Sequence, residues 1–112
     1  MYLYDARMQI DTEGFRALGD PVRLRILRFL LDQGGMCCAS PGRVCACDIV
    51  AMLDLAQPTV SHHMQILTRA GLVSAEKRGR WMFYTVDPGR FAALAAQLQA
   101  VADVARPLAT AA

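Results

Sequence analysis

The sequence predicts a small, mainly α-helical domain that carries one β-hairpin. Two patterns in its 112 residues point to this fold class. Apolar residues recur at helical spacing in several segments, and one later segment alternates with a period of two around an Arg-Gly turn. Hydrophobic residues make up 54% of the chain, which is far above the disordered range. We therefore expect residues 1–112 to fold as a single domain.

The N-terminal third predicts two or three helices. Residues 1–18 mix apolar and charged residues, and we expect one or two short helices there, covered by a partner subunit. Asp20 and Pro21 mark a helix start, because an N-cap acceptor is followed by proline in the first turn. The helix should run to Asp32, with Arg23 and Arg25 on its outer side. Its predicted core face consists of Leu24, Leu27, Leu30 and Leu31.

Residues 48–71 have the proportions of a helix-turn-helix. A short helix is expected from Asp48 to Leu53, followed by a turn. Pro58 then lies in the first turn of the second helix, and Gly71 is expected to cap its end. The buried stripe of this second helix is predicted to be Val60, Met64 and Leu67.

Residues 73–86 alternate about a turn at Arg78 and Gly79, which predicts a two-stranded hairpin with a basic tip. A last helix is expected from Arg90, and its small residues and apolar stripe are typical of helix-on-helix packing. That stripe is Phe91, Leu94, Leu98 and Val101. The order of helix, helix-turn-helix, hairpin and helix is that of a winged helix-turn-helix.

Three segments in this order resemble the ArsR/SmtB family of repressors. They are an opening Ala-Leu-Gly-Asp-Pro-Val-Arg-Leu-Arg-Ile-Leu (17–27), a recognition helix Gln-Pro-Thr-Val-Ser-His-His-Met-Gln-Ile-Leu (57–67), and a wing with Gly-Leu-Val (71–73) and Arg-Gly-Arg-Trp-Met-Phe-Tyr (78–84). The resemblance implies a homodimeric transcriptional repressor that binds palindromic double-stranded operator DNA. Residues 1–18 and 90–106 would then form the dimer interface, since such readers bind two half-sites about 34–36 Å apart.

Polar side chains at the start of the second helix of the helix-turn-helix are the expected readers of DNA bases. Glutamine can bond adenine through two atoms, hydroxyls suit several bases, and arginines at a hairpin tip suit phosphates or the minor groove. The predicted DNA-binding residues are Gln57, Thr59, Ser61, His62, His63 (toward phosphate), Arg78 and Arg80. Family members usually place a hydroxyl residue before the Gln-Pro, where this chain has Ala56.

All four cysteines fall between residues 37 and 47. Disulfides within so short a segment could not link distant parts of the fold, so the cluster favours metal binding or thiol chemistry. Cys45 and Cys47 would point about 200° apart on a regular helix. We expect them to converge instead, with Cys45 before a helix and Cys47 in its first turn, where the helix N-terminus favours thiolate.

The run Val-Cys-Ala-Cys-Asp (44–48) resembles the members of the family that sense arsenic and antimony. The resemblance implies that cysteine thiolates bind arsenite or antimonite as inducer and that binding releases the operator. In the best-known pattern a third cysteine stands at the position of Val50. Trivalent arsenic prefers three thiolates, so Cys37 or Cys38 is the expected source of the third.

Other hypotheses for the function of the four cysteines stay open. A zinc site fits poorly, because structural sites usually pair cysteines two to four residues apart. A redox switch would join Cys37 or Cys38 to Cys45 or Cys47. Cadmium or lead could replace arsenic, and an unregulated DNA-binding module is the rival that the thiol cluster disfavours. The family's other type of metal site uses histidine and carboxylate ligands on the C-terminal helix. It is excluded because residues 90–106 contain no histidine and only one acidic residue, Asp103.

Enzymatic activity and a catalytic cofactor are not expected. His62 and His63 lie at an exposed helix start, and the chain has no phosphate loop or hydrolase elbow. No apolar run approaches the length of a membrane span, and the N-terminus lacks a signal-peptide pattern. We therefore expect a cytoplasmic protein.

Overall fold

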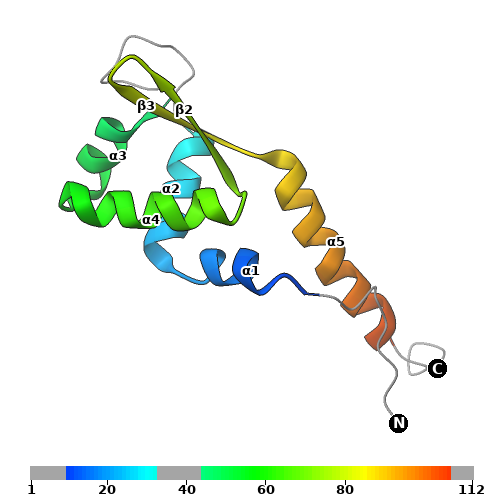
Figure 1. Cartoon of the computed structure of the whole chain (residues 1–112). Coiled ribbons are helices and arrows are strands. Elements are labelled where there is room, and N and C mark those ends of the chain that lie inside the picture. The colour runs from blue at the N-terminus through cyan, green and yellow to red at the C-terminus, as the bar shows by residue number, and fades with distance from the viewer. Residues whose placement is uncertain (1–9, 33–43, 107–112) are drawn as a thin grey trace.

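A computed structural model describes residues 10–32 and 44–106 of the chain. Helices predominate, and a small antiparallel sheet lies at one end (Figure 1). The elements in order are α1 (Thr12–Leu18), α2 (Pro21–Asp32), β1 (Val44–Cys45), α3 (Ala46–Leu53), α4 (Gln57–Arg69), β2 (Val73–Arg78), β3 (Trp81–Val86) and α5 (Pro88–Ala105). This arrangement confirms the predicted winged helix-turn-helix.

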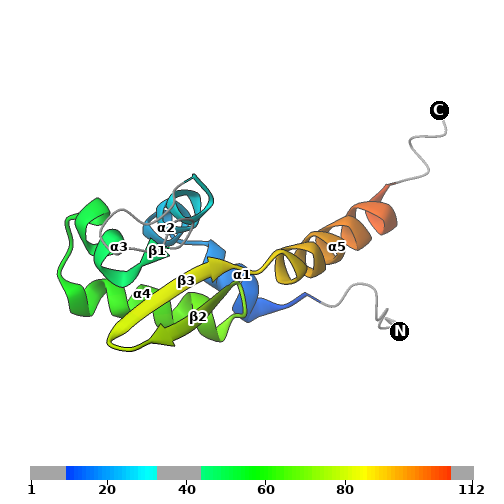
Figure 2. The same ribbon diagram turned by 90° about the horizontal axis from the view of Figure 1, so that it is seen from above.

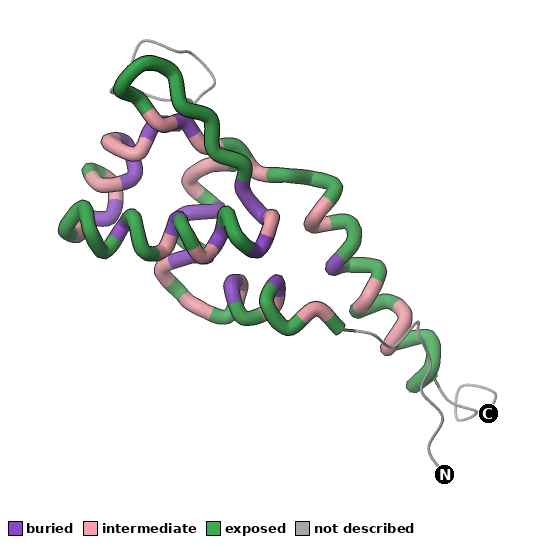
Figure 3. The backbone as a smooth tube through the Cα atoms, viewed as in Figure 1, coloured by how far each residue is buried: buried purple, intermediate pink, exposed green. Residues whose placement is uncertain are grey.

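The core lies between α2, α3 and α4 and is closed by the residues where α4 leads into β2. Ile26, Ile49, Leu67 and Leu72 are completely buried in it. Figure 3 shows the buried positions gathered on the inner sides of these helices, whereas the wing and most of α5 are exposed. The core therefore holds the helix-turn-helix in place and leaves the tip of the sheet free in solvent.

The predicted inner face of α2 is wrong in part. Arg23, expected on the outside, is only 8% exposed, while Leu24 and Leu31 are 49% and 70% exposed. The inward stripe is instead Arg23, Ile26 and Leu27, which still follows helical spacing. An arginine can occupy this stripe because carbonyl oxygens at the end of α1 accept its N–H groups. The predicted helix start is confirmed, since Asp20 accepts from the Arg23 backbone N–H at 3.0 Å.

The helix-turn-helix is confirmed, with α3 starting at Ala46 rather than Asp48. Its turn is made by Asp54, which adopts the left-handed conformation with φ of 55°. Val60, Met64 and Leu67 form the buried stripe of α4, as predicted.

The end of α4 differs slightly from the prediction, because the capping residue is Ala70 and Gly71 follows it with φ of 77°. The backbone N–H groups of Gly71 and Leu72 donate to the carbonyls of Thr68 and Leu67, which is the hydrogen-bond pattern of a Schellman motif. Glycine suits this position because its φ is positive.

The wing has three strands in the order β1-β3-β2, one more than the sequence predicted. The predicted hairpin is present, and Arg78 pairs with Trp81 next to its turn. The additional strand β1 has two residues, and it places Val44 opposite Tyr84 and Cys45 opposite Phe83. So short a strand lacks a readable alternation, which is why the sequence did not reveal it.

Helix α5 extends away from the body of the domain (Figure 2). Its N-terminus is fixed by Arg90, whose Nε donates to the Ala70 carbonyl at 2.7 Å and whose guanidinium pairs with Asp11. Along the helix only Leu94 is buried, whereas Leu98 is 55% exposed. In the described part of the chain, no helix combines the length and the apolar character that crossing a membrane requires.

Candidate DNA-reading surface and thiol site

The first turns of α4 present four of the predicted DNA-reading residues to solvent. Gln57, Thr59, Ser61 and His62 are all exposed, while Val60 between them is buried. Ala56 caps this helix without a side-chain hydrogen bond, as its lack of a hydroxyl predicts. The exposed N-terminal turns of a helix with a packed inner face form the arrangement that enters a major groove.

His63 lies differently from its neighbours. Its side chain is 13% exposed, and its Nδ1 accepts a hydrogen bond from the Arg23 guanidinium at 3.1 Å. Because arginine can only donate, Nδ1 carries no proton and the ring is neutral. Burial, opposed by the nearby Asp20 carboxylate, lowers the pKa of His63 below its ordinary value of 6.5. His63 thus joins α4 to the start of α2 and is less exposed than the four other predicted DNA-binding residues of this helix, and its contact with phosphate stays a prediction.

This lowered pKa predicts that the folded protein loses stability in mild acid. The unfolded chain protonates His63 near pH 6.5, whereas the folded chain resists protonation. The stability contribution is therefore complete above pH 6.5 and declines as the pH falls through the lower folded pKa. Urea unfolding across this range should show the decline in the wild type and in a His62→Gln control. A His63→Gln variant should have a flatter profile, and an unchanged profile would contradict the assignment.

The wing turn carries the other two predicted DNA contacts. Arg78 and Arg80 are both exposed, and they flank Gly79. Arg78 pairs with Glu76 at 3.3 Å on the surface, whereas the Arg80 guanidinium lies over the Trp81 ring, 5.1 Å from its centroid. These two arginines therefore have different environments, although both stand at the tip of the same hairpin.

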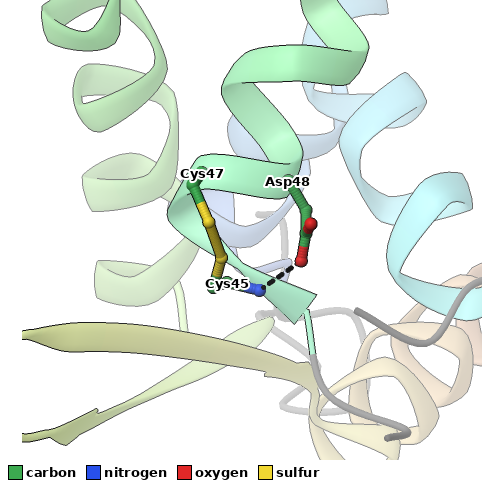
Figure 4. The surroundings of a disulfide bond; sticks show 3 residues. All are labelled: Cys45, Cys47 and Asp48. Atoms are coloured by element: carbon green, nitrogen blue, oxygen red, sulfur yellow. Dashed lines mark hydrogen bonds between the residues drawn. A yellow bond between two sulfur atoms is a disulfide. The ribbon is translucent and has the colours of Figure 1, made fainter. Parts of the chain in front are cut away.

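Cys45 and Cys47 converge at the start of α3, as predicted. Cys45 is the N-cap residue and Cys47 lies in the first turn, and the two sulfurs are joined in a disulfide (Figure 4). Cys45 is 1% exposed and Cys47 is half-buried. The redox hypothesis predicted a disulfide from Cys37 or Cys38 to Cys45 or Cys47, whereas the disulfide in the structure joins Cys45 to Cys47. Those two cysteines lie outside the described residues.

Asp48 belongs to the same site, although the sequence suggested only a first-turn acid. Its carboxylate is buried and accepts a hydrogen bond from the Cys45 backbone N–H at 3.1 Å. A carboxylate oxygen of Asp48 and the two sulfurs lie within 4.8 Å of one another. Asp48 follows the N-cap residue Cys45 by three positions, which is the spacing of a capping box. This spacing is the sequence signal that could have placed the Asp48 carboxylate beside Cys45.

Cys45 and Cys47 line a pocket of about 390 Å³ between α3, α4 and the wing, and we call this place the thiol site. Val50, which stands where a third cysteine is usual in the family, is in its wall. The complete lining is Cys45, Ala46, Cys47, Val50, Ala51, Gln57, Arg80, Trp81 and Met82. Two predicted DNA contacts thus share this pocket with both sulfurs.

Comparison with known proteins identifies the family of the chain. Residues 20–75 match the family described as bacterial regulatory protein, arsR family. An uncharacterized HTH-type transcriptional regulator of Methanocaldococcus jannaschii is 46% identical over 79 residues, which is 70% of this chain and 80% of that protein. The arsenical resistance operon repressor of Escherichia coli is 34% identical over 74 residues, covering 66% of this chain and 56% of the repressor.

A solved structure shares the fold as well. The crystal structure of a "possible transcriptional regulator for arsenical resistance" is 26% identical, with a TM-score of 0.66, and the match covers 80% of this chain and 84% of that one. The family consists of transcriptional regulators, so the prediction of a regulator rather than an enzyme is confirmed. The chain is a member of the ArsR family of winged helix-turn-helix transcriptional regulators.

Proposed function

We propose that this regulator represses transcription by binding operator DNA as a homodimer and that it dissociates when cysteine thiolates bind arsenite or antimonite. The observation that carries the proposal is the convergence of Cys45 and Cys47 beside Gln57 of α4 and Arg80 of the wing, two of the residues predicted to contact DNA. The Escherichia coli relative is named as an arsenical resistance operon repressor, which supports the same ligand class. The protein would act in the cytoplasm, where promoter DNA lies.

The DNA-binding part of the proposal rests on α4 and the wing tip. Gln57, Thr59, Ser61 and His62 would contact bases in the major groove. Arg78 and Arg80 would contact phosphates or the neighbouring minor groove. All six side chains are exposed, and they belong to two elements that the core and the sheet hold in place.

The ligand-binding part rests on thiol chemistry. A thiol reductant first reduces the disulfide to two thiols and is itself oxidised to a disulfide. Each thiol then forms one sulfur–arsenic bond, and its proton leaves with one arsenite hydroxide as water, so no further electrons move. Cys45 and Cys47 supply two thiolates, and we propose that Cys37 or Cys38 supplies a third.

The dimer is supported by apolar side chains that the single chain leaves in solvent. Leu98 and Val104 on α5 are 55% and 50% exposed, and Ile10 before α1 is 50% exposed. Burial of such side chains against a second copy stabilises an assembly by about 25 cal/mol per Å² of apolar surface. Two-fold symmetry would also present two copies of α4 to the two halves of a palindrome.

A second candidate is a thiol redox-responsive repressor of the same fold. The disulfide between Cys45 and Cys47 favours it, because a pair that closes within one protomer can respond to oxidant without a metal. Cadmium or lead are further thiophilic ligands for the same site. The difference between these candidates is the agent that releases the DNA.

A gel-shift assay on the regulator's own promoter region separates the candidates. Reduced protein should retard the DNA, and arsenite or antimonite should release it at lower concentration than cadmium, lead, zinc or an oxidant. Release by oxidant alone would favour the redox function. Retardation that none of these agents alters would contradict a ligand-responsive repressor and leave an unregulated DNA-binding module.

A further inference from the structure

The pocket at the thiol pair is bounded on another side by the wing. Cys45 and Cys47 line it together with Arg80 and Trp81, which belong to the hairpin turn and the start of β3. A ligand held by the two sulfurs therefore occupies a space that the Trp81 side chain helps to enclose. We propose that Trp81 is the positioning residue through which occupancy of the thiol site changes the wing. This inference rests on the proposed function and specifies how the ligand acts on DNA binding.

The backbone supplies one connection. Cys45 is a residue of the sensor and also of strand β1, where it is paired with Phe83 of β3. Trp81 begins that same strand, two residues before Phe83. A displacement of the Cys45 backbone is therefore passed to β3 by strand pairing, and from β3 to the turn at Gly79 and Arg80.

The side chains supply a second connection. Trp81 helps to line the pocket, and the centroid of its ring lies 5.1 Å from the Arg80 guanidinium carbon. A cation is attracted to the face of an aromatic ring, so a displaced ring favours a displaced guanidinium. Trp81 is 41% exposed, so it has room to move outward when the pocket is filled. The expected consequence is a displaced Arg80, which loses its contact with phosphate.

The first test measures coupling instead of binding alone. Coupling is the ratio of operator dissociation constants with and without arsenite. The Trp81→Ala variant is tested at saturating arsenite, with uptake followed by thiolate–arsenic absorption, and is compared with its own ligand-free operator affinity. Its coupling ratio should fall about tenfold. The control is Thr85→Ala, an exposed position on the same strand that hydrogen-bonds Ser74 and does not line the pocket. Wild-type coupling in Trp81→Ala would overturn the proposal.

The second test uses the wild-type protein and needs no variant at position 81. Trp81 is the only tryptophan in the chain, so tryptophan fluorescence reports on this residue alone. Adding arsenite to reduced wild-type protein should change Trp81 fluorescence in proportion to bound ligand. Cys47→Ser should show no such change. Bound arsenite with unchanged emission would overturn the role of Trp81 while leaving a ligand-responsive repressor intact. A changed emission without DNA release would instead contradict the proposed function.

Discussion

Replacing Cys47 with serine is expected to leave operator binding unchanged and to abolish release by arsenite. Cys47 is half-buried in the first turn of α3, and serine fits the same space and keeps a polar group there. It removes one of the two converging sulfurs, and an alcohol is a poor ligand for a soft, thiophilic ion. In the wild type arsenite should weaken operator binding about 10- to 100-fold, whereas in Cys47→Ser the change should be lost.

Fluorescence anisotropy of a labelled operator duplex measures both quantities. The matched control is Ser74→Ala, an exposed wing position outside the thiol pocket that should keep the complete arsenite response. Cys45→Ser should behave like Cys47→Ser, with an additional check of stability because Cys45 is buried at the N-cap. A Cys47→Ser protein that still releases DNA at the wild-type arsenite concentration would place the sensor elsewhere.

Replacing Arg23 with methionine is expected to be the most destabilising change among the charged residues discussed here. Methionine retains much of the apolar stem but removes the hydrogen bonds to the carbonyls of Ala17 and Arg16 and to His63. A fully buried acceptor left without a donor costs about 1–3 kcal/mol. Only the contact with Ala17 is fully buried and the other two are partly buried, so the total loss should be about 2–4 kcal/mol. A domain of this size would then melt roughly 10–20 °C lower.

The control for this change is Arg25→Met, two residues along the same helix on its exposed side. It should alter the free energy of unfolding by less than about 0.5 kcal/mol. Thermal unfolding followed by circular dichroism compares the two. Equal melting temperatures would show that Arg23 is an ordinary surface arginine, as its sequence context had suggested.

The sequence predicted the order of the helices and the hairpin, but it did not predict strand β1 or the complete inner face of α2. Regular signals predicted the helices: Asp20 and Pro21 at the start of α2, Pro58 in the first turn of α4, and Val60 and Met64 on the buried face of α4. The α2 stripe was mispredicted because leucine was counted as inward and arginine as outward. A buried arginine depends on acceptors from another helix, which periodicity does not reveal.

The candidate site was predictable from residue chemistry, while its surroundings depend on tertiary structure. The convergence of Cys45 and Cys47 followed from a helix boundary, and the exposure of Gln57 and Ser61 followed from the stripe of α4. The pocket shared with Trp81 depends on strand β1, which is too short to read from sequence. The inward position of His63 likewise depends on its contact with Arg23, forty positions earlier.

We propose that the same small domain reads an operator and releases it through the Cys45–Cys47 site. The most direct measurement is an anisotropy titration of an operator duplex, bound to fully reduced wild-type protein, with arsenite. We expect the anisotropy to fall to that of free DNA as arsenite reaches one equivalent per protomer, and we expect added dithiol chelator to restore the complex. Anisotropy that stays at the bound value while the protein takes up arsenite would contradict it.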